Sequence, residues 1–292
     1  MNGFFFGLGY SARAAIEELR ADGPEAHRFA GTTRSQESFE RLAAEGIAMH
    51  LFDAATLSPD LDAASHVVSS VAPAEGADPV LVRHQTGLDA AKDLEWLCYY
   101  STVGVYGDFG GAWIDESAAL HPLNQRSRDR ITAEQLWRDY AEARGLPLLV
   151  LRLSGIYGPG RSTFEKLADG SARRIVKPGQ VFNRIHVEDI GRVTALAAAR
   201  KLAGTYNLTD DAPAPPQDVV AFAADLEGIE PPAEMPFETA EMTPMARSFY
   251  SDNKRVSNKA IKQALGIELL YPSYREGLTA LYAQRELTHG RT

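Results

Sequence analysis

The sequence contains a single cysteine, no long hydrophobic run and a deficit of positive charge. The lone thiol, Cys98, cannot form an internal disulfide, and its place in the apolar stretch 96–100 predicts a buried, unreactive side chain. No apolar segment approaches the roughly 20 residues that a membrane-spanning helix needs. The formal net charge of −9 argues against nucleic acid as the main partner.

The N-terminus also lacks a basic leader, because the apolar run Phe4–Phe6 follows almost at once. We therefore expect a cytoplasmic protein that has no membrane partner. A chain of 292 residues with 45% hydrophobic and 24% charged residues has the composition of a globular protein of one large or two modest domains. Its core can be large, so stability requires no disulfide, and we predict no metal site.

The most informative segment is the first dozen residues. After Phe4–Phe6 come two glycines and then apolar residues at helical spacing, which is the strand, turn and helix of a dinucleotide-binding βαβ unit. Gly7 permits the tight turn, Gly9 lets the backbone approach a pyrophosphate, and Ala12 lets the helix pack close to the strand. The N–H groups at the start of the helix attract phosphate. The predicted cofactor contacts in this loop are Gly7, Gly9, Tyr10, Ser11 and Ala12. An ordinary βα turn is the alternative.

Strand-like and helix-like segments alternate through the first half of the chain. Further strands are predicted over 28–33, 47–52, 66–71, 96–101 and 148–153, with a helix from about 130 to 143 before the last of them. Short apolar runs between helices favour a parallel sheet covered on both faces. The predicted class is therefore α/β, a Rossmann-type doubly wound parallel sheet with a smaller C-terminal substrate lobe.

The composition of the sequence changes after Gly158, where prolines become frequent. Helices are predicted over 218–226 and 258–265 in this part. We place a dinucleotide-binding domain at 1–158, joined by about 183–210, and assign 159–292 mainly to the substrate-binding lobe.

The end of the second predicted strand bears on the choice of cofactor. It reads Gly31-Thr32-Thr33-Arg34-Ser35, without the acidic residue that would bind the 2′-hydroxyl of NAD. Arg34 can contact a 2′-phosphate through two N–H groups, so NADP(H) is favoured, with NAD(H) as the alternative. Asp53 follows the third strand and is either an acceptor for the adenine amino group or a surface aspartate.

Four later motifs carry a resemblance to a known family. They are Tyr-Ser-Thr-Val-Gly-Val-Tyr-Gly at 100–107, Arg-Leu-Ser-Gly-Ile-Tyr-Gly-Pro-Gly at 152–160, Arg-Ile-His-Val-Glu-Asp-Ile at 184–190, and Gly-Thr-Tyr-Asn-Leu at 204–208. In this order, and with the N-terminal loop, they resemble the extended short-chain dehydrogenase/reductase superfamily, also described as NAD-dependent epimerase/dehydratase. The resemblance runs to about residue 226.

The resemblance implies roles for several residues. Thr102 matches the catalytic Ser/Thr that hydrogen-bonds the oxygen of a substrate carbonyl or alcohol, although it could instead satisfy only a strand end. Ser70, Val71 and Ala72 would line the cofactor, and Tyr157 and Pro159 would lie beside the nicotinamide. The resemblance allows a homodimer, since dimers are common in the superfamily.

One departure from the family pattern matters for the mechanism. The family carries Tyr-x-x-x-Lys on the helix after the Ser/Thr, where this chain has Arg126-x-x-x-Arg130. A guanidinium stays protonated at working pH, so Arg126 is no general acid or base, although it can stabilise charge as a fixed cation. Arg130 can hold the ribose or a phosphate. The pattern resembles the atypical branch of the superfamily.

A proton must then come from another group. The candidates are Tyr106, Tyr157, His186 and a water molecule, of which His186 titrates in the useful range without perturbation. Tyr106 as a core aromatic and His186 as the brace of a loop are the alternatives.

A basic segment after the sixth strand points to the charge of the substrate. Between 160 and 184 the chain has six cationic residues against two acidic ones, and Arg161 and Arg184 are the predicted substrate contacts. This charge would attract an anionic small molecule, or it is a solvated face. We therefore carry two hypotheses: an NAD(P)-dependent oxidoreductase or epimerase/dehydratase-like enzyme, and a non-catalytic NADP(H)-binding redox sensor or regulator.

Overall fold

The computed structural model describes residues 1–21, 27–54 and 57–289. It divides the chain into two compact units, which we call the first and the second unit. The first unit comprises residues 1–105, 124–152 and 190–206, and the second comprises 106–123, 153–189 and 207–292. The loop 106–123 thus lies in the second unit, whereas residues 190–206 return to the first.

A seven-stranded sheet forms the centre of the fold. Its strands are β1 (Asn2–Phe6), β2 (Arg28–Thr33), β3 (Ala48–Leu51), β4 (His66–Ser69), β5 (Trp96–Thr102), β7 (Leu148–Leu153) and β11 (Gly204–Leu208), in the order β11-β7-β5-β4-β1-β2-β3. β1 pairs in parallel with both β2 and β4. The strand order reverses at this point, and in open α/β sheets ligands bind outside the carboxyl ends of the strands that flank such a reversal.

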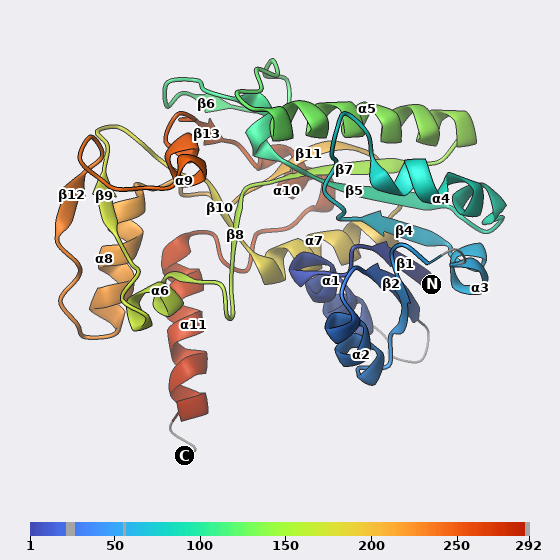
Figure 1. The fold of residues 1–292 in the computed structure, drawn as a ribbon, viewed down its shortest axis with the longest axis horizontal. Helices are drawn as coiled ribbons and strands as arrows, with labels where there is room; N and C mark the ends of the chain where they lie inside the picture. The colour runs from blue at the N-terminus through green and yellow to red at the C-terminus, as the bar shows by residue number, and fades with distance from the viewer. Residues whose placement is uncertain (22–26, 55–56, 290–292) are drawn as a thin grey trace. The chain divides into compact units, whose positions relative to one another are not determined.

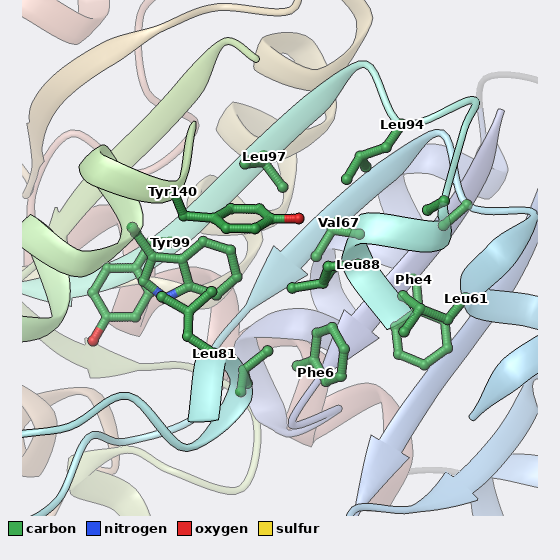
Figure 2. Packing of buried hydrophobic residues seen from close by; sticks show 14 of the residues in the cluster. Phe4, Phe6, Leu61, Val67, Leu81, Leu88, Leu94, Leu97, Tyr99 and Tyr140 are labelled. Carbon is green, nitrogen blue, oxygen red and sulfur yellow. The ribbon is translucent and has the colours of Figure 1, made fainter. Parts of the chain in front are cut away.

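Helices cover both faces of this sheet (Figure 1). The helices of the first unit are α1 (Tyr10–Ala21), α2 (Gln36–Ala44), α3 (Ser58–Asp62), α4 (Pro79–Ala90), α5 (Gln125–Arg144) and α7 (Val187–Ala199), the last of which begins in the second unit. α3, α4 and α5 pack on one face through a core that includes Phe4, Phe6 and Leu97 (Figure 2). α1 and α7 approach closely, since a Cβ at Gly191 would lie 2.5 Å from the backbone oxygen of Ala14. The sheet is therefore buried on both sides, as continuous apolar strands require.

The predicted α/β class with a parallel, doubly wound sheet is confirmed. The strands predicted at 28–33 and 148–153 have the observed bounds, and those at 47–52 and 66–71 are shorter in the structure. α5 begins at Gln125, earlier than the predicted start near 130, because Asn124 caps it by accepting from the Ser127 backbone N–H. Arg126 therefore lies within the helix.

The second unit contains short strands and helices. The strands are β6 (Trp113–Ile114), β8 (Gly155–Tyr157), β9 (Arg174–Val176), β10 (Arg184–His186), β12 (Glu234–Pro236) and β13 (Arg255–Val256). The helices are α6 (Thr163–Ala168), α8 (Pro216–Leu226), α9 (Pro244–Phe249), α10 (Lys259–Leu265) and α11 (Tyr274–His289), and a 3₁₀ turn, η1, spans Val103–Tyr106. α6, α8 and α11 share an apolar core that includes Phe164, Val219 and Leu278.

None of the helices in the described part of the chain is both long and apolar enough to cross a membrane.

Candidate functional site

The glycine loop after β1 is held from two sides. Gly7 adopts a φ of +75°, which a residue with a side chain rarely tolerates, and its N–H donates to Thr32 Oγ1 at 2.9 Å. The Leu8 N–H donates to the Thr32 backbone oxygen at 2.7 Å. On the other side, the Ser70 hydroxyl donates to the Gly7 carbonyl oxygen. β2 and the end of β4 thus fix the loop between them.

The backbone in front of this loop is open at Gly9. A Cβ at Gly9 would have only the Gly7 backbone oxygen within 4 Å, at 3.8 Å, so the backbone is open to a ligand there. α1 begins at the next residue, and its first-turn N–H groups have no intrahelical acceptor. Ser11 and Ala12 are buried against the sheet. The N-terminus of a 12-residue helix behind an open glycine is the arrangement that binds dinucleotide phosphates.

A cation directly follows β2, at the position where we predict a contact with the ribose phosphate of the cofactor. Arg34 directly follows β2, is exposed, and has no hydrogen-bond or ion-pair partner among the described residues. The next residue, Ser35, caps α2 by accepting from the Ser38 N–H at 3.2 Å. Asp53, predicted to meet the adenine, is 68% exposed and forms an ion pair with Arg83. The Asp53 carboxylate therefore already has a partner in Arg83, and its contact with adenine stays a prediction.

The loop after β4 connects the glycine loop to α5. Ser70 contacts Gly7, as described, and Val71 packs against the core of the first unit. Further along, the Gly76 N–H donates to Asp129 Oδ1 of α5 at 3.0 Å. Ala72 is exposed. The predicted cofactor-lining residues Ser70, Val71 and Ala72 thus lie between two anchored points.

At the end of β5, Thr102 lies close to a second hydroxyl. Thr102 Oγ1 accepts from the Gly104 N–H at 3.1 Å. A Cβ placed on Gly104 would lie 3.4 Å from Ser127 Oγ and 3.5 Å from Thr102 Oγ1, so both hydroxyls border the same point of the backbone. Sequence reasoning missed Ser127, because the family pattern directs attention to the positions of the tyrosine and the lysine.

Arg126 and Arg130 have different surroundings. The Arg130 guanidinium donates through Nη1 to the Tyr100 backbone oxygen at 2.7 Å and to Tyr99 Oη at 3.2 Å. It thereby fastens α5 to β5 through Nη1, and its role toward the cofactor ribose stays a prediction. Arg126 is exposed and, within the described residues, makes no hydrogen bond or ion pair.

A buried ion cluster lies further along the same helix. Glu134 is fully buried and accepts from Ser101 Oγ at 2.5 Å, from Arg138 Nη2 at 2.9 Å and from Arg152 Nη2 at 2.8 Å. Burial by itself would raise the pKa of Glu134, but the bonds and charge of Arg152 bring it below its usual value. The carboxylate therefore stays ionised and ties α5 to β5 next to Thr102. Sequence reasoning missed Glu134. The available signal was a charged residue on the apolar face of the predicted helix.

Three predicted proton donors lie in the second unit. Tyr106 is fully buried and donates to Asn207 Oδ1 at 2.7 Å. The rings of Tyr157 and His186 meet edge to face, with centroids 5.1 Å apart. Burial raises the pKa of Tyr157, with Asp210 and Asp189 adding to the shift.

His186 is deeply enclosed in this unit. It is 1% exposed, and burial lowers its pKa to about 4. Its Nδ1 accepts from the Glu188 N–H, so Nε2 carries the proton. His186 is therefore neutral at physiological pH. These surroundings favour structural roles, and proton transfer by the three residues stays a prediction.

The predicted substrate arginines also belong to the second unit. Arg184 donates through Nη1 to the backbone oxygens of Phe182 at 3.0 Å and Ala214 at 3.1 Å. Arg161 is exposed and pairs through its backbone with Gly158, on either side of Pro159. Part of the basic segment is thus used to hold the chain in place.

A family model described as the NAD dependent epimerase/dehydratase family matches residues 7–209 of the chain. A solved structure of a conserved protein of unknown function from Silicibacter pomeroyi is 48% identical, with a TM-score of 0.88 over 97% of this chain and 99% of the other. Human epimerase family protein, solved with NADPH, shares the fold at 15% identity, with a TM-score of 0.73 over 96% of this chain and 99% of the other.

A curated relative extends the comparison to a protein of stated activity. It is the 3-diazoavenalumate denitrifying reductase of a Streptomyces species, 28% identical over 144 residues, which are 44% of this chain and 45% of the relative. The chain thus matches less than half the length of the curated relatives.

Proposed function

This chain belongs to the NAD dependent epimerase/dehydratase family, and we propose that it is an NADP(H)-dependent oxidoreductase or epimerase-like enzyme. Its reaction is hydride transfer at a carbonyl or alcohol carbon of a small, anionic substrate. The observation that carries the proposal is the glycine loop, held by Thr32 and Ser70 in front of the α1 N-terminus. A homodimer remains a prediction from the family resemblance.

The residues of the first unit account for cofactor binding. The glycine loop and the first turn of α1 hold the diphosphate, and Ser70 to Ala72 line the path toward the nicotinamide. Arg34 directly follows β2, two residues beyond Thr32, and its guanidinium pairs with a 2′-phosphate. Solved structures of the same fold include a human protein with NADPH and bacterial epimerases with NAD, so both cofactors have a precedent and the preference depends on Arg34. When bound, the cofactor supplies or accepts the hydride.

The substrate contacts combine a hydroxyl with two fixed cations. Thr102 donates a hydrogen bond to the substrate oxygen, and Arg126 stabilises the negative charge that develops there. Arg130, fastened to Tyr100, holds the nicotinamide ribose with its remaining N–H groups. Neither arginine moves a proton, so water supplies it, since the environments of Tyr106, Tyr157 and His186 favour structural roles.

The negative charge of the substrate is inferred from cations that face solvent. Arg161, Lys166 and Arg173 are exposed in the basic segment, and Arg126 is exposed at the start of α5. The cations of the basic segment would raise the local concentration of an anion at the second unit, and Arg126 would do so at the start of α5 in the first unit.

The cofactor assignment is tested by the affinities of NADPH and NADH for wild type and Arg34→Asp, measured by fluorescence titration. We expect wild type to bind NADPH at least tenfold more tightly and the variant to prefer NADH, because the substitution replaces a phosphate contact with repulsion. Arg41→Asp, a similar charge change on the exposed side of α2, serves as the control. Equal affinities that Arg34→Asp leaves unmoved would contradict the NADP(H) preference.

The enzyme assignment is tested by NADPH oxidation with a panel of acidic and neutral carbonyl compounds. Thr102→Val should lower kcat/KM about a hundredfold without weakening NADPH binding. Tight NADPH binding without turnover of any carbonyl compound would instead favour the redox sensor, which the loss of the Tyr-x-x-x-Lys pair also fits.

A further inference from the structure

We propose that Thr102, Ser127 and Arg126 together form a receptor for a 2-oxo acid, with two hydroxyls for the carbonyl oxygen and a guanidinium for the carboxylate. The proposal rests on the function proposed above. It goes further by naming a substrate class and by adding Ser127 as a residue that contacts the substrate.

Ser127 has the properties of a ligand-binding hydroxyl. Its side chain lies in the first turn of α5 and is 6% exposed, while its backbone N–H is held by Asn124 at 3.0 Å. Within the described residues, no group pairs with its Oγ. Ser127 Oγ is not among the fully buried polar atoms that lack a partner, so this oxygen is open to a ligand. A substrate oxygen next to Thr102 would supply the missing partner.

The helix places Arg126 level with Thr102. Ser127 lies next to Gly104 and Arg130 reaches back to Tyr100, so α5 runs antiparallel to β5. Arg126 lies one turn before Arg130 on the same helix face, a step of about 6 Å, and Thr102 lies two strand residues beyond Tyr100, a step of about 6.6 Å. The two steps nearly match, which brings the Arg126 position alongside the Thr102 end of the strand.

These three groups match the chemistry of a 2-oxo acid. A guanidinium presents a planar fork that binds a carboxylate through two N–H groups, and it keeps its charge at every working pH. In a 2-oxo acid the carboxylate is bonded directly to the carbonyl carbon, so a neighbouring cation and two hydroxyls can be engaged at once. A simple ketone would leave Arg126 without a partner, which predicts discrimination between the acid and its ester.

The reaction balances with water as the proton source. The carbonyl carbon accepts the hydride, and the electron pair of the C=O π bond moves onto the oxygen. Thr102 and Ser127 donate hydrogen bonds to that oxygen as its charge grows. The oxygen then takes a proton from a water molecule, and solvent neutralises the resulting hydroxide. The product is a 2-hydroxy acid.

A pair of matched substrates tests the carboxylate contact. NADPH oxidation is measured with pyruvate and phenylpyruvate and with their methyl esters. We expect wild type to favour the acids at least tenfold in kcat/KM, and Arg126→Met to lose about that factor on the acids but not on the esters. Arg128→Met, which removes a nearby arginine bonded to Gln125, should behave as wild type. Equal rates on acid and ester, or an unmoved preference in Arg126→Met, would overturn the proposal.

A second experiment needs no turnover. The thiol of native Cys98 is 1% exposed and should resist iodoacetamide, whereas Ser127 Oγ is not fully buried, so Ser127→Cys introduces a thiol that the reagent can reach. We expect NADPH with oxamate, a 2-oxo acid analogue, to slow this labelling at least fivefold, and Arg126→Met to abolish the oxamate effect. Ser117→Cys, at an exposed position, should be labelled without protection. A thiol at 127 that oxamate does not protect, or that iodoacetamide does not reach, would overturn the site.

The two experiments separate the failure of this inference from the failure of the proposed function. Reduction of neutral carbonyl compounds without preference for acids keeps the enzyme and removes the 2-oxo acid receptor. Failure to bind NADPH or to reduce any carbonyl compound removes the enzyme, whereas oxamate protection that depends on Arg126 would still support the receptor.

Discussion

Thr32 is the residue on which the glycine loop depends most directly. Its side chain accepts from the Gly7 N–H and its backbone oxygen accepts from the Leu8 N–H, and it is fully buried. Thr32→Val keeps the shape of the side chain but leaves the Gly7 N–H without an acceptor. We expect NADPH affinity to fall about fivefold to tenfold, in line with the roughly 1 kcal/mol of one hydrogen bond. Fluorescence titration measures the change, and Thr86→Val on the exposed side of α4 is the control.

One outcome would contradict this role of Thr32. If Thr32→Val binds NADPH as wild type does while Arg34→Asp changes the preference, then the loop keeps its shape without the hydroxyl. The sequence offered little warning of this contact, because a threonine in a strand is ordinary by its β propensity. The role of Thr32 becomes visible only in the structure, where β2 lies beside the loop after β1.

Glu134 shows how a single charged residue can fasten two elements. Arg152 donates to it through both Nε and Nη2, at 3.0 and 2.8 Å, and both side chains are buried. Glu134→Gln removes the negative charge that accepts both hydrogen bonds from the buried Arg152 guanidinium, and we expect a loss of about 3 kcal/mol in the free energy of unfolding. Asp139→Asn, in an exposed side-chain pair with Gln135 on the same helix, should cost about 0.5 kcal/mol or less. Similar urea midpoints for the two variants would contradict this account of the cluster.

The contact of α1 with α7 is limited by a glycine. A Cβ at Gly191 would lie 2.5 Å from the backbone oxygen of Ala14, and backbone cannot move aside as a side chain does. We expect Gly191→Ala to destabilise the protein by about 2 kcal/mol despite the better helix propensity of alanine. Gly87→Ala is a matched contrast in another helix, since its Cβ would meet the flexible end of Leu61 at 2.7 Å. Thermal melting should show the larger loss for Gly191→Ala; the reverse order would sink the argument.

At the level of elements, the sequence predicted what local periodicity determines. The segments 28–33 and 148–153 form strands with the predicted bounds, and each contains a short apolar run, Phe29–Gly31 in the first and Leu148–Leu151 in the second, as expected for a strand buried on both faces. The start of α5 was misplaced because residues 125–130 are mostly polar and only the Asn124 cap marks the boundary. The candidate site shows the same limit: the glycine loop was visible in the sequence, whereas the proximity of Ser127 to Thr102 depends on how a helix packs against a strand.

Two groups of buried residues should make the stability of the whole chain depend on pH in opposite directions. Burial lowers the pKa of His66 and His84 in the first unit and of His186 in the second. The unfolded chain therefore binds more protons as pH falls through about 6.5, and acid destabilises the fold. Asp210 works in the other direction. Its burial raises the pKa from 3.8 to about 8, so the folded chain keeps a proton that the unfolded chain loses, and stability falls as pH rises from about 4 to 8.

Asp210→Asn separates the two effects. The amide resembles the neutral carboxyl group but cannot ionise, so the variant should gain of the order of 2 kcal/mol relative to wild type when pH is raised from 6 to 9. Urea unfolding at several pH values measures this difference. Asp225→Asn on the exposed side of α8 should show none. Asp210 Oδ2 is buried and has no hydrogen-bond partner among the described residues. We expect the proton of the neutral carboxyl group on this oxygen. Parallel pH profiles for wild type and Asp210→Asn would mean that Asp210 is ionised in the folded protein and that Arg184, whose charge favours the anion, outweighs the cost of burial.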